Sequence, residues 1–155
     1  MRAYSADLYR FAYWLCRDRH AAEDLVQEAC LRGWKSWLEL RDPSQAKAWL
    51  MTILRNEHAR GYSRRKNEAN LDDVHESELP SIPSFEAGLD AAQVVRLLPG
   101  TYREPLLLQV IGGFSCAEIA GILGTSEGAV MTRLTRARQA LRQQHFDSIK
   151  RRSVR

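Results

Sequence analysis

The sequence predicts an all-α protein of two small helical bundles joined by an acidic linker, with a helix-turn-helix in the C-terminal bundle. Apolar residues recur at three- and four-residue spacing through both ends of the chain, as on one face of a helix. The stretch 66–90 lacks this period, contains Pro80 and Pro83, and has a net charge of −6. Residues 115–138 carry the capping and turn residues of two closely crossing helices. The predicted boundaries are 1–66 for the first bundle, 67–90 for an acidic flexible linker, 91–145 for the second bundle and 146–155 for a basic tail.

The first bundle is expected to contain three helices. The first has an apolar side made of Leu8, Phe11, Ala12 and Leu15. The second, over 20–37, is acidic at its start and basic toward its end, as the helix dipole favours. Its apolar positions are Val26, Cys30, Gly33, Trp34 and Trp37. The Asp42-Pro43-Ser44 sequence then indicates a turn, and a third helix with a basic far end follows over about 46–65.

The second bundle is expected to begin with a helix over 91–98 that ends at Pro99-Gly100. A further helix opens at Arg103-Glu104-Pro105 and stops at Gly112-Gly113. Each half of the chain has only about 60 residues, so each apolar core is small and marginally stable. Both bundles are therefore expected to gain order from a large partner.

The helix-turn-helix is the most specific feature of the chain. Ser115 and Glu118 have capping-box spacing, and Gly124 falls where the chain must leave the first helix in a left-handed conformation. Thr125 or Ser126 can cap a second helix, whose apolar positions are Val130, Leu134, Ala137 and Leu141. No acidic residue lies between Glu127 and the arginine at 142, and such a unit places its second helix in a DNA major groove. Helical proteins that never touch DNA also contain such turns, and this alternative stays open.

The overall charge of +4 conceals two basic blocks around the acidic one, with net charges of +4 over 1–65 and +6 over 91–155. Basic blocks favour polyanions, because neutralising phosphates releases condensed counterions. The three cysteines are far apart and the histidines do not cluster, so neither a disulfide framework, a metal site nor a cofactor is expected. No nucleophile–base arrangement or phosphate loop indicates an enzyme. The sequence has no membrane-length apolar stretch and no signal peptide core, which predicts a cytoplasmic protein without membrane insertion.

Residues 22–34, AEDLVQEACLRGW, are similar to a stretch of region 2 in bacterial RNA polymerase sigma factors of the extracytoplasmic-function (ECF) group. The resemblance covers both helical blocks and implies regions 2 and 4 of the sigma-70 superfamily. In that family this stretch grips the clamp helices of the polymerase β′ subunit. The residues that would do so here share one helix face and are Asp24, Gln27, Glu28 and Leu31. An ordinary solvated helix face is the alternative for these residues taken alone.

A second motif, Trp49 to Asn56, resembles the family helix that opens and reads the −10 element with the loop before it, here about 38–46. The resemblance implies that Asn56 lines a pocket for a base flipped from the non-template strand. An asparagine amide both donates and accepts, so it can read an unstacked base edge. The basic residues implied to hold the separated strand are Arg55, Arg60, Arg64 and Arg65. Trp49 as a core residue and Asn56 as a surface amide are the alternatives.

The helix-turn-helix resembles family region 4, which reads the −35 element and whose neighbours contact the polymerase β flap. The candidates for base or phosphate contact are Glu127, Met131, Thr132, Arg133 and Arg136. An arginine–guanine pair is the commonest specific major-groove contact, worth roughly 1–3 kcal/mol of discrimination. Met131 stands where the family often has lysine, Pro105 where it has an aliphatic residue, and Arg60 where aspartate is common.

The resemblance implies an alternative sigma factor that binds core polymerase and directs promoter-specific initiation, and that an anti-sigma factor controls. The expected partners are the polymerase β′ clamp helices and β flap, promoter DNA and that anti-sigma factor. A one-component helix-turn-helix regulator is the main alternative; it would bind its operator without polymerase. A third reading is a sigma-like module that binds polymerase but not promoters. The acidic linker either threads toward the polymerase active centre, as in the family, or only solubilises the chain.

Overall fold

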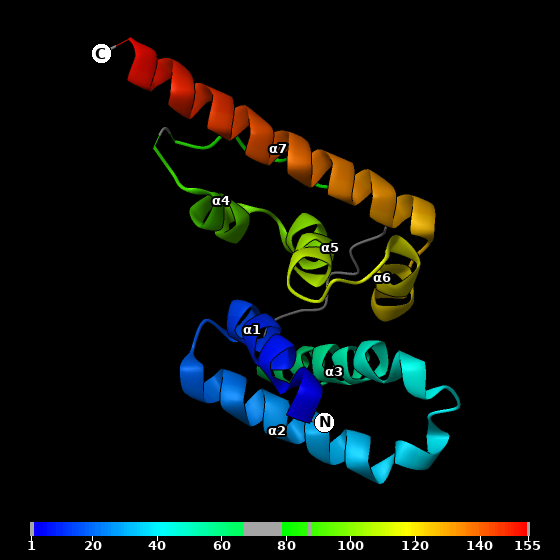
Figure 1. The fold of residues 1–155 in the computed structure, drawn as a ribbon. Helices are drawn as coiled ribbons and strands as arrows, with labels where there is room; N and C mark the ends of the chain where they lie inside the picture. The colour runs from blue at the N-terminus through cyan, green and yellow to red at the C-terminus, as the bar shows by residue number, and fades with distance from the viewer. Residues whose placement is uncertain (1, 67–78, 87, 155) are drawn as a thin grey trace.

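The computed structural model describes residues 2–66, 79–86 and 88–154. These residues form helices and three short 3-10 turns, with no strand among them, in two layers (Figure 1). The first layer contains α1 (Ser5–Cys16), α2 (Arg19–Lys35) and α3 (Ala46–Lys66), with 3-10 turns at Arg2–Tyr4, Trp37–Glu39 and Pro43–Gln45. The second contains α4 (Ala91–Leu97), α5 (Gly100–Val110), α6 (Cys116–Leu123) and α7 (Glu127–Ser153). The predicted all-α class with two helical bundles is confirmed.

The first bundle is closed by an apolar core between α1 and α3, with small residues of α2 against them. The buried side chains are Leu8, Phe11 and Ala12 on α1, Ala22 and Ala29 on α2, and Leu50, Met51 and Leu54 on α3. Burying each large side chain contributes about 1.5–3 kcal/mol. Asp18 caps α2 by accepting from the backbone N–H of His20 at 2.9 Å. The expectation that Trp34 and Trp37 belong to the apolar side of this helix is wrong, because their side chains are 74 % and 46 % exposed.

The second bundle begins at Asp90, which forms a capping box with Gln93 at the start of α4. Helix α5 starts at Gly100, so the prediction that Arg103-Glu104-Pro105 opens it is wrong. Pro105 lies inside the helix and is buried. Proline removes one backbone hydrogen bond there, but the helix also buries Tyr102 and Leu106 around it, and this packing keeps the chain helical.

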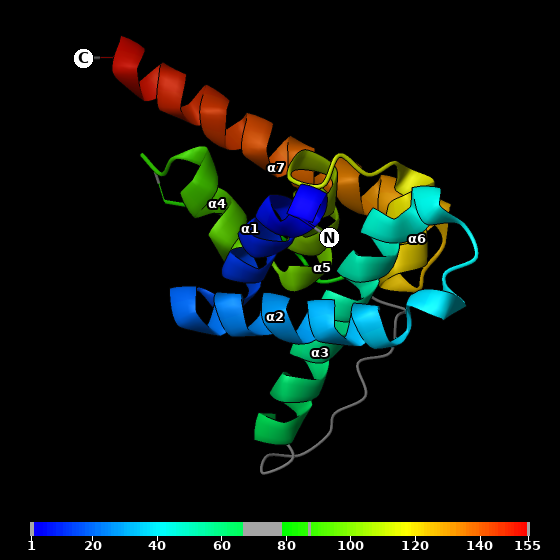
Figure 2. The same ribbon diagram turned by 60° about the horizontal axis from the view of Figure 1, so that its bottom comes forward.

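The helix-turn-helix forms as the local sequence predicts. The Ser115 hydroxyl accepts from the Glu118 N–H at 3.2 Å, and the Glu118 carboxylate accepts from the Ser115 N–H at 3.1 Å. Gly124 ends α6 with a left-handed φ of 67°, and Ser126 caps α7 through the Ala129 N–H at 3.1 Å. Helix α7 continues to Ser153 through most of the predicted basic tail, and its C-terminal end projects beyond the bundle (Figure 2).

Part of the predicted linker packs on the second bundle. Residues 79–86 form no helix, but Leu79, Ile82 and Phe85 are half-buried against the core. The Tyr102 hydroxyl donates to the Pro80 carbonyl, and the buried Gln144 amide of α7 donates to the Glu86 carbonyl at 2.8 Å. The predicted linker thus includes a segment, 79–86, that contacts the second bundle. The rest of the linker before this segment lies outside the described residues.

The two bundles also pack against each other, where the sequence suggested separate bodies. Helix α3 contacts α6, and buried residues of both bundles form one continuous apolar cluster. Lys47, at the start of α3, reaches both the Asp7 carboxylate at 2.7 Å and the Gly112 carbonyl at 2.6 Å. Its ammonium also lies 5.2 Å from the centre of the Phe114 ring, a cation–π contact. The corner between α5 and α6 is thus one of the points where the bundles meet.

We expect Gly112→Ala to lower the free energy of unfolding by about 1–3 kcal/mol. A Cβ at Gly112 would lie 2.5 Å from the Phe114 ring and 2.7 Å from the Leu108 carbonyl oxygen, which is backbone and cannot turn away. Urea denaturation measures the effect. Gly121→Ala is the matched control: its added methyl would meet no atom within 4 Å beyond its chain neighbours and the nearby backbone of its own helix, and alanine favours helix by up to about 1 kcal/mol. Equal stability of the two variants would contradict this packing.

Candidate polymerase and nucleic-acid interfaces

The face of α2 predicted to bind a helical partner is open to solvent. Asp24, Gln27, Glu28 and Leu31 are all exposed, and Leu31 shows 56 % of its surface. Trp34, the tryptophan of α2, continues this face about one helical turn beyond Leu31 and is 74 % exposed. Sequence periodicity placed Trp34 in the core and so missed it. Large exposed apolar side chains beside acidic groups are typical of a protein-binding surface.

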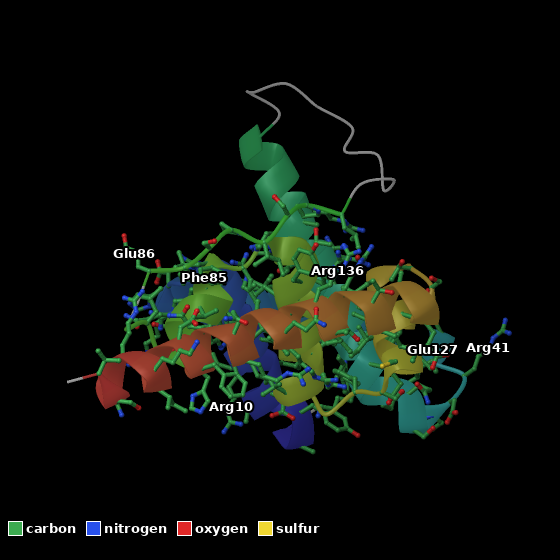
Figure 3. All side chains as sticks on the ribbon, turned by 90° about the horizontal axis from the view of Figure 1, so that it is seen from above. Arg10, Arg41, Phe85, Glu86, Glu127 and Arg136 are labelled. Atoms are coloured by element: carbon green, nitrogen blue, oxygen red, sulfur yellow. The ribbon has the colours of Figure 1, made fainter. Side chains whose placement is uncertain are left out.

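The loop between α2 and α3 is held by its own polar groups. Asp42 accepts from the Ser44 hydroxyl at 2.7 Å and from the Ser44 N–H at 3.0 Å. These hydrogen bonds hold the pKa of the Asp42 carboxyl below its ordinary value, with the hydroxyl contributing most. Arg41 precedes this turn and points outward at one end of the molecule (Figure 3). The loop therefore presents a cation on an ordered turn.

A hollow of about 250 Å³ lies between the end of α2 and the middle of α3. Two predicted site residues, the exposed Asn56 and Arg60, line this hollow. Arg32 of α2 lines it as well. Glu57 is the carboxylate in its lining and is paired with Arg32 at 2.5 Å and Arg60 at 3.3 Å. Sequence reasoning named Asn56 and Arg60 but missed Arg32, Lys35 and Glu57. Arg32 and Glu57 lie on different helices, so their ion pair could not be predicted before the packing of α2 on α3 was known.

Arg55 is not free in this arrangement. Its Nε atom lies 3.0 Å from the Glu104 carboxylate of α5, so this cation of α3 is used in the contact between the bundles. Arg64 and Arg65 lie at the end of α3, and their side chains are outside the described part of the structure. Of the four arginines of α3 predicted to hold the separated strand, the structure therefore describes the side chains of Arg55 and Arg60.

The second helix of the helix-turn-helix presents the predicted groove-facing residues. Glu127, Met131, Thr132 and Arg136 are exposed, while Arg133 is half-buried. The Thr132 hydroxyl donates to the Gly128 carbonyl at 3.1 Å, within its own helix. Glu127 lies at the same end of the molecule as Arg41 (Figure 3). The two predicted DNA-contacting elements, the loop before α3 and the start of α7, thus lie toward one end.

Arg136 faces a different surface from the start of α7. It lines a cavity of about 670 Å³ between α7 and residues 79–85, together with Gln139 and Gln143. Figure 3 labels Arg136 and Phe85 of this lining. In this arrangement the segment before α4 and Arg136 line the same cavity.

Charged contacts close the other edge between the bundles. The Arg96 carbonyl, in the last turn of α4, accepts from Arg17 of the first bundle at 2.9 Å and from Arg103 at 2.9 Å. Burial, and next the nearby charge of Arg17, lower the pKa of the Arg103 guanidinium. The Arg96 guanidinium lies 5.7 Å from the Trp14 ring centre.

Within the described ranges, no group of three or more acidic, histidine or cysteine side chains could hold a metal ion. None of the helices there is both long and apolar enough to cross a bilayer. The arrangement offers hydrogen-bond donors, guanidinium groups and exposed apolar side chains, which are the means of binding nucleic acid and protein.

The sequence matches two family descriptions, Sigma-70 region 2 over residues 1–68 and Sigma-70, region 4 over residues 89–141. It is 35 % identical to the ECF RNA polymerase sigma factor EcfG of Rhodopseudomonas palustris over 138 residues, covering 86 % of this chain and 76 % of that protein. The chain belongs to the ECF sigma factors. It is also 35 % identical to the ECF sigma factor SigL of Mycobacterium tuberculosis over 146 residues, covering 90 % of this chain and 82 % of SigL.

A solved structure has a related fold. The sigma factor RpoE of Bartonella quintana, crystallised in complex with the anti-sigma factor NepR, is 31 % identical, with a TM-score of 0.71 and coverage of 92 % of both chains. Members of this family are transcription initiation factors, and the helix-turn-helix of the present sigma factor is its region 4. The protein is therefore an alternative sigma factor, and region 2 is its first bundle.

Proposed function

We propose that this sigma factor docks on core polymerase through α2, captures the melted −10 strand beside α3 and reads the −35 duplex with α7. The observation that carries the proposal is the simultaneous exposure of the α2 face, the hollow at Asn56 and the start of α7. Each contains residues for which the resemblance to the family implies contact with polymerase or promoter DNA.

On α2, Leu31 supplies the apolar contact, and Asp24, Gln27 and Glu28 around it complement a basic helical partner. An exposed apolar residue ringed by polar groups is the usual composition of an interface centre. Trp34 extends the same apolar contact. The partner is the clamp helices of the β′ subunit, and the β flap is the partner of the second bundle.

On α7, the first two turns enter the major groove at the −35 element. Glu127 and Thr132 can meet base edges, because a carboxylate accepts from cytosine and a threonine methyl contacts thymine. Arg133 and Arg136 donate to guanine or to phosphate. Met131 offers an apolar contact in place of a cation.

The two bundles must separate when both elements are bound. The labels −10 and −35 place the two elements about 25 base pairs apart, which at about 3.4 Å per pair is roughly 85 Å. A compact chain of this length has a radius of gyration of about 15 Å and a diameter of about 40 Å. The packed form therefore cannot hold both elements, and its contacts at Arg55–Glu104 and Arg17–Arg96 must open. Release of Arg55 from Glu104 then frees a cation for the separated strand.

We propose that an anti-sigma protein controls the chain by holding this packed form. The likeness to RpoE, whose structure contains an anti-sigma factor, supports this proposal because it extends over 92 % of both chains. A partner that bridges the two bundles would keep Arg55 paired with Glu104.

Transcription by purified core polymerase on genomic fragments of the source organism tests the function. With this chain added, we expect initiation at a set of promoters that share one upstream motif, and weak binding of the free chain to the same DNA. A one-component regulator would instead bind tightly without polymerase. No initiation at any fragment would refute the proposal.

Asn56→Ala and Arg133→Ala, made separately, distinguish promoter reading from polymerase binding alone. We expect each variant to bind core polymerase normally but to lose about 1–3 kcal/mol of base discrimination, or roughly 5- to 150-fold, at one position in the −10 or −35 element. Position-by-position promoter substitution measures the loss. Unchanged promoter selection by both variants would favour a module that binds polymerase without reading DNA.

A further inference from the structure

The hollow between α2 and α3 contains a charge arrangement that the sigma-family motif does not describe. Its lining consists of Arg32, Lys35, Ser36, Ile53, Asn56, Glu57 and Arg60. At about 250 Å³ it is smaller than the roughly 300–1,000 Å³ of pockets for drug-sized ligands. Ile53 provides an apolar wall, and Trp37 follows Ser36 with 46 % of its surface exposed. A site of this size and composition suits one unstacked nucleobase.

Glu57 is the unusual group in this hollow. Its side chain is only 11 % exposed, and a carboxylate so enclosed requires partners. Both of its ion pairs use the same oxygen: Arg32 Nε lies 2.5 Å and Arg60 Nη1 lies 3.3 Å from Oε1. In both pairs the contact recorded is to Oε1. Glu57 is thus oriented by two guanidinium groups, and Oε2 is the oxygen that these two contacts leave for a third group.

An ionised carboxylate can only accept hydrogen bonds. Cytosine and adenine present an exocyclic amino donor beside a ring-nitrogen acceptor, whereas thymine presents the O4 acceptor in place of the amino group. Either of these bases can donate its amino hydrogen to Oε2 while its ring nitrogen accepts from a guanidinium beside Glu57. Thymine has only its N3–H to donate, and this donor lies between O2 and O4, so a carboxylate that accepts from N3–H lies against a neighbouring acceptor that repels it.

We propose that Glu57 is a specificity-determining residue of the −10 site, selecting cytosine or adenine over thymine at the captured position. This inference rests on the proposed function, in which a base enters the hollow beside Asn56. Arg32 and Arg60 act as positioning residues that hold the carboxylate. With Lys35, the lining has three basic side chains and one acidic one, so its net charge is positive. A positive charge suits the phosphate attached to the captured base.

Transcription from promoters with a pre-opened bubble tests the inference, because base capture is then separated from melting. The bubble carries each of the four bases in turn at every non-template position of the −10 element. With wild-type chain and core polymerase, we expect one position at which cytosine or adenine exceeds thymine by at least about fivefold. If the wild-type chain shows no such position, the proposal is overturned, and no variant is needed to reach that conclusion.

Glu57→Gln is the matched variant, because glutamine has the same shape and its amide can donate to thymine O4. We expect the cytosine-to-thymine ratio at that one position to fall at least about fivefold, with the other positions unchanged. Glu23→Gln, which removes the α2 carboxylate paired with Arg19 outside the hollow, should leave all ratios unchanged. Initiation by Glu57→Gln with the wild-type base profile would overturn the role of Glu57. Failure of the wild-type chain on every bubble would instead refute the proposed function.

Discussion

Cross-linking the two bundles is expected to reduce promoter-specific initiation by about 10²–10⁴-fold, the factor that a second tethered binding site contributes. Arg17 and Arg96 suit the attachment, because the Arg17 guanidinium reaches the Arg96 carbonyl at 2.9 Å and neither residue lies on a proposed DNA or polymerase surface. A flexible bismaleimide between Arg17→Cys and Arg96→Cys would hold region 2 against region 4. The chain could then engage the −10 or the −35 element, but not both.

The native cysteines Cys16, Cys30 and Cys116 are each half-buried and would be replaced by alanine in this experiment. Run-off transcription with core polymerase measures initiation, and a pull-down measures core binding, which we expect to persist because the α2 face remains open. The double variant before cross-linking and the reagent-treated Arg17→Cys single variant are the controls. Full initiation by the cross-linked chain would show that the packed form can direct initiation, and that the two bundles need not separate to reach both promoter elements.

Leu31→Asp is expected to weaken core polymerase binding by at least about 30-fold, which corresponds to the roughly 2 kcal/mol that defines an interface hot spot. Leu31 is 56 % exposed, so its replacement removes little from the core of region 2. An aspartate there places an unpaired carboxylate at the centre of the apolar contact. Titration of core polymerase into fluorescently labelled chain measures the dissociation constant.

Ile149→Asp is the control for this prediction. Ile149 is 48 % exposed but lies near the far end of α7, away from the α2 face. Circular dichroism should show both variants to be folded. If the two substitutions weaken core binding equally, the effect is one of added charge, and the α2 face is not the docking surface.

The helix-turn-helix shows which part of the fold could be predicted from the sequence. The capping box at Ser115, the left-handed Gly124 and the Ser126 cap are decided by neighbours within a few residues, and all three occur in the structure. The all-α class and the approximate spans of α2 and α3 follow from helical periodicity in the same way. Local rules were sufficient because each depends on one turn of helix.

Helical periodicity was not sufficient to predict features that depend on packing between elements distant in the sequence. It placed Trp34 and Trp37 on the apolar side of their helix, but the core of region 2 is narrow, and small residues of α2 already fill the contact. It opened α5 at Arg103-Glu104-Pro105, but the helix begins at Gly100 and already buries Tyr102 before the proline. In the candidate site, the motif identified Asn56, while Arg32 and Glu57 meet only after α2 and α3 pack together.

The sequence by itself determined the helices, the turn of the helix-turn-helix and the family to which the chain belongs, because capping, period and motif act over short stretches. Only the tertiary structure decided that regions 2 and 4 pack together, that Arg55 is paired with Glu104 and that Glu57 lines the hollow between α2 and α3. These features join residues 25 to 79 positions apart in the chain. Such contacts depend on how apolar faces are buried against each other, and no local pattern of residues specifies that.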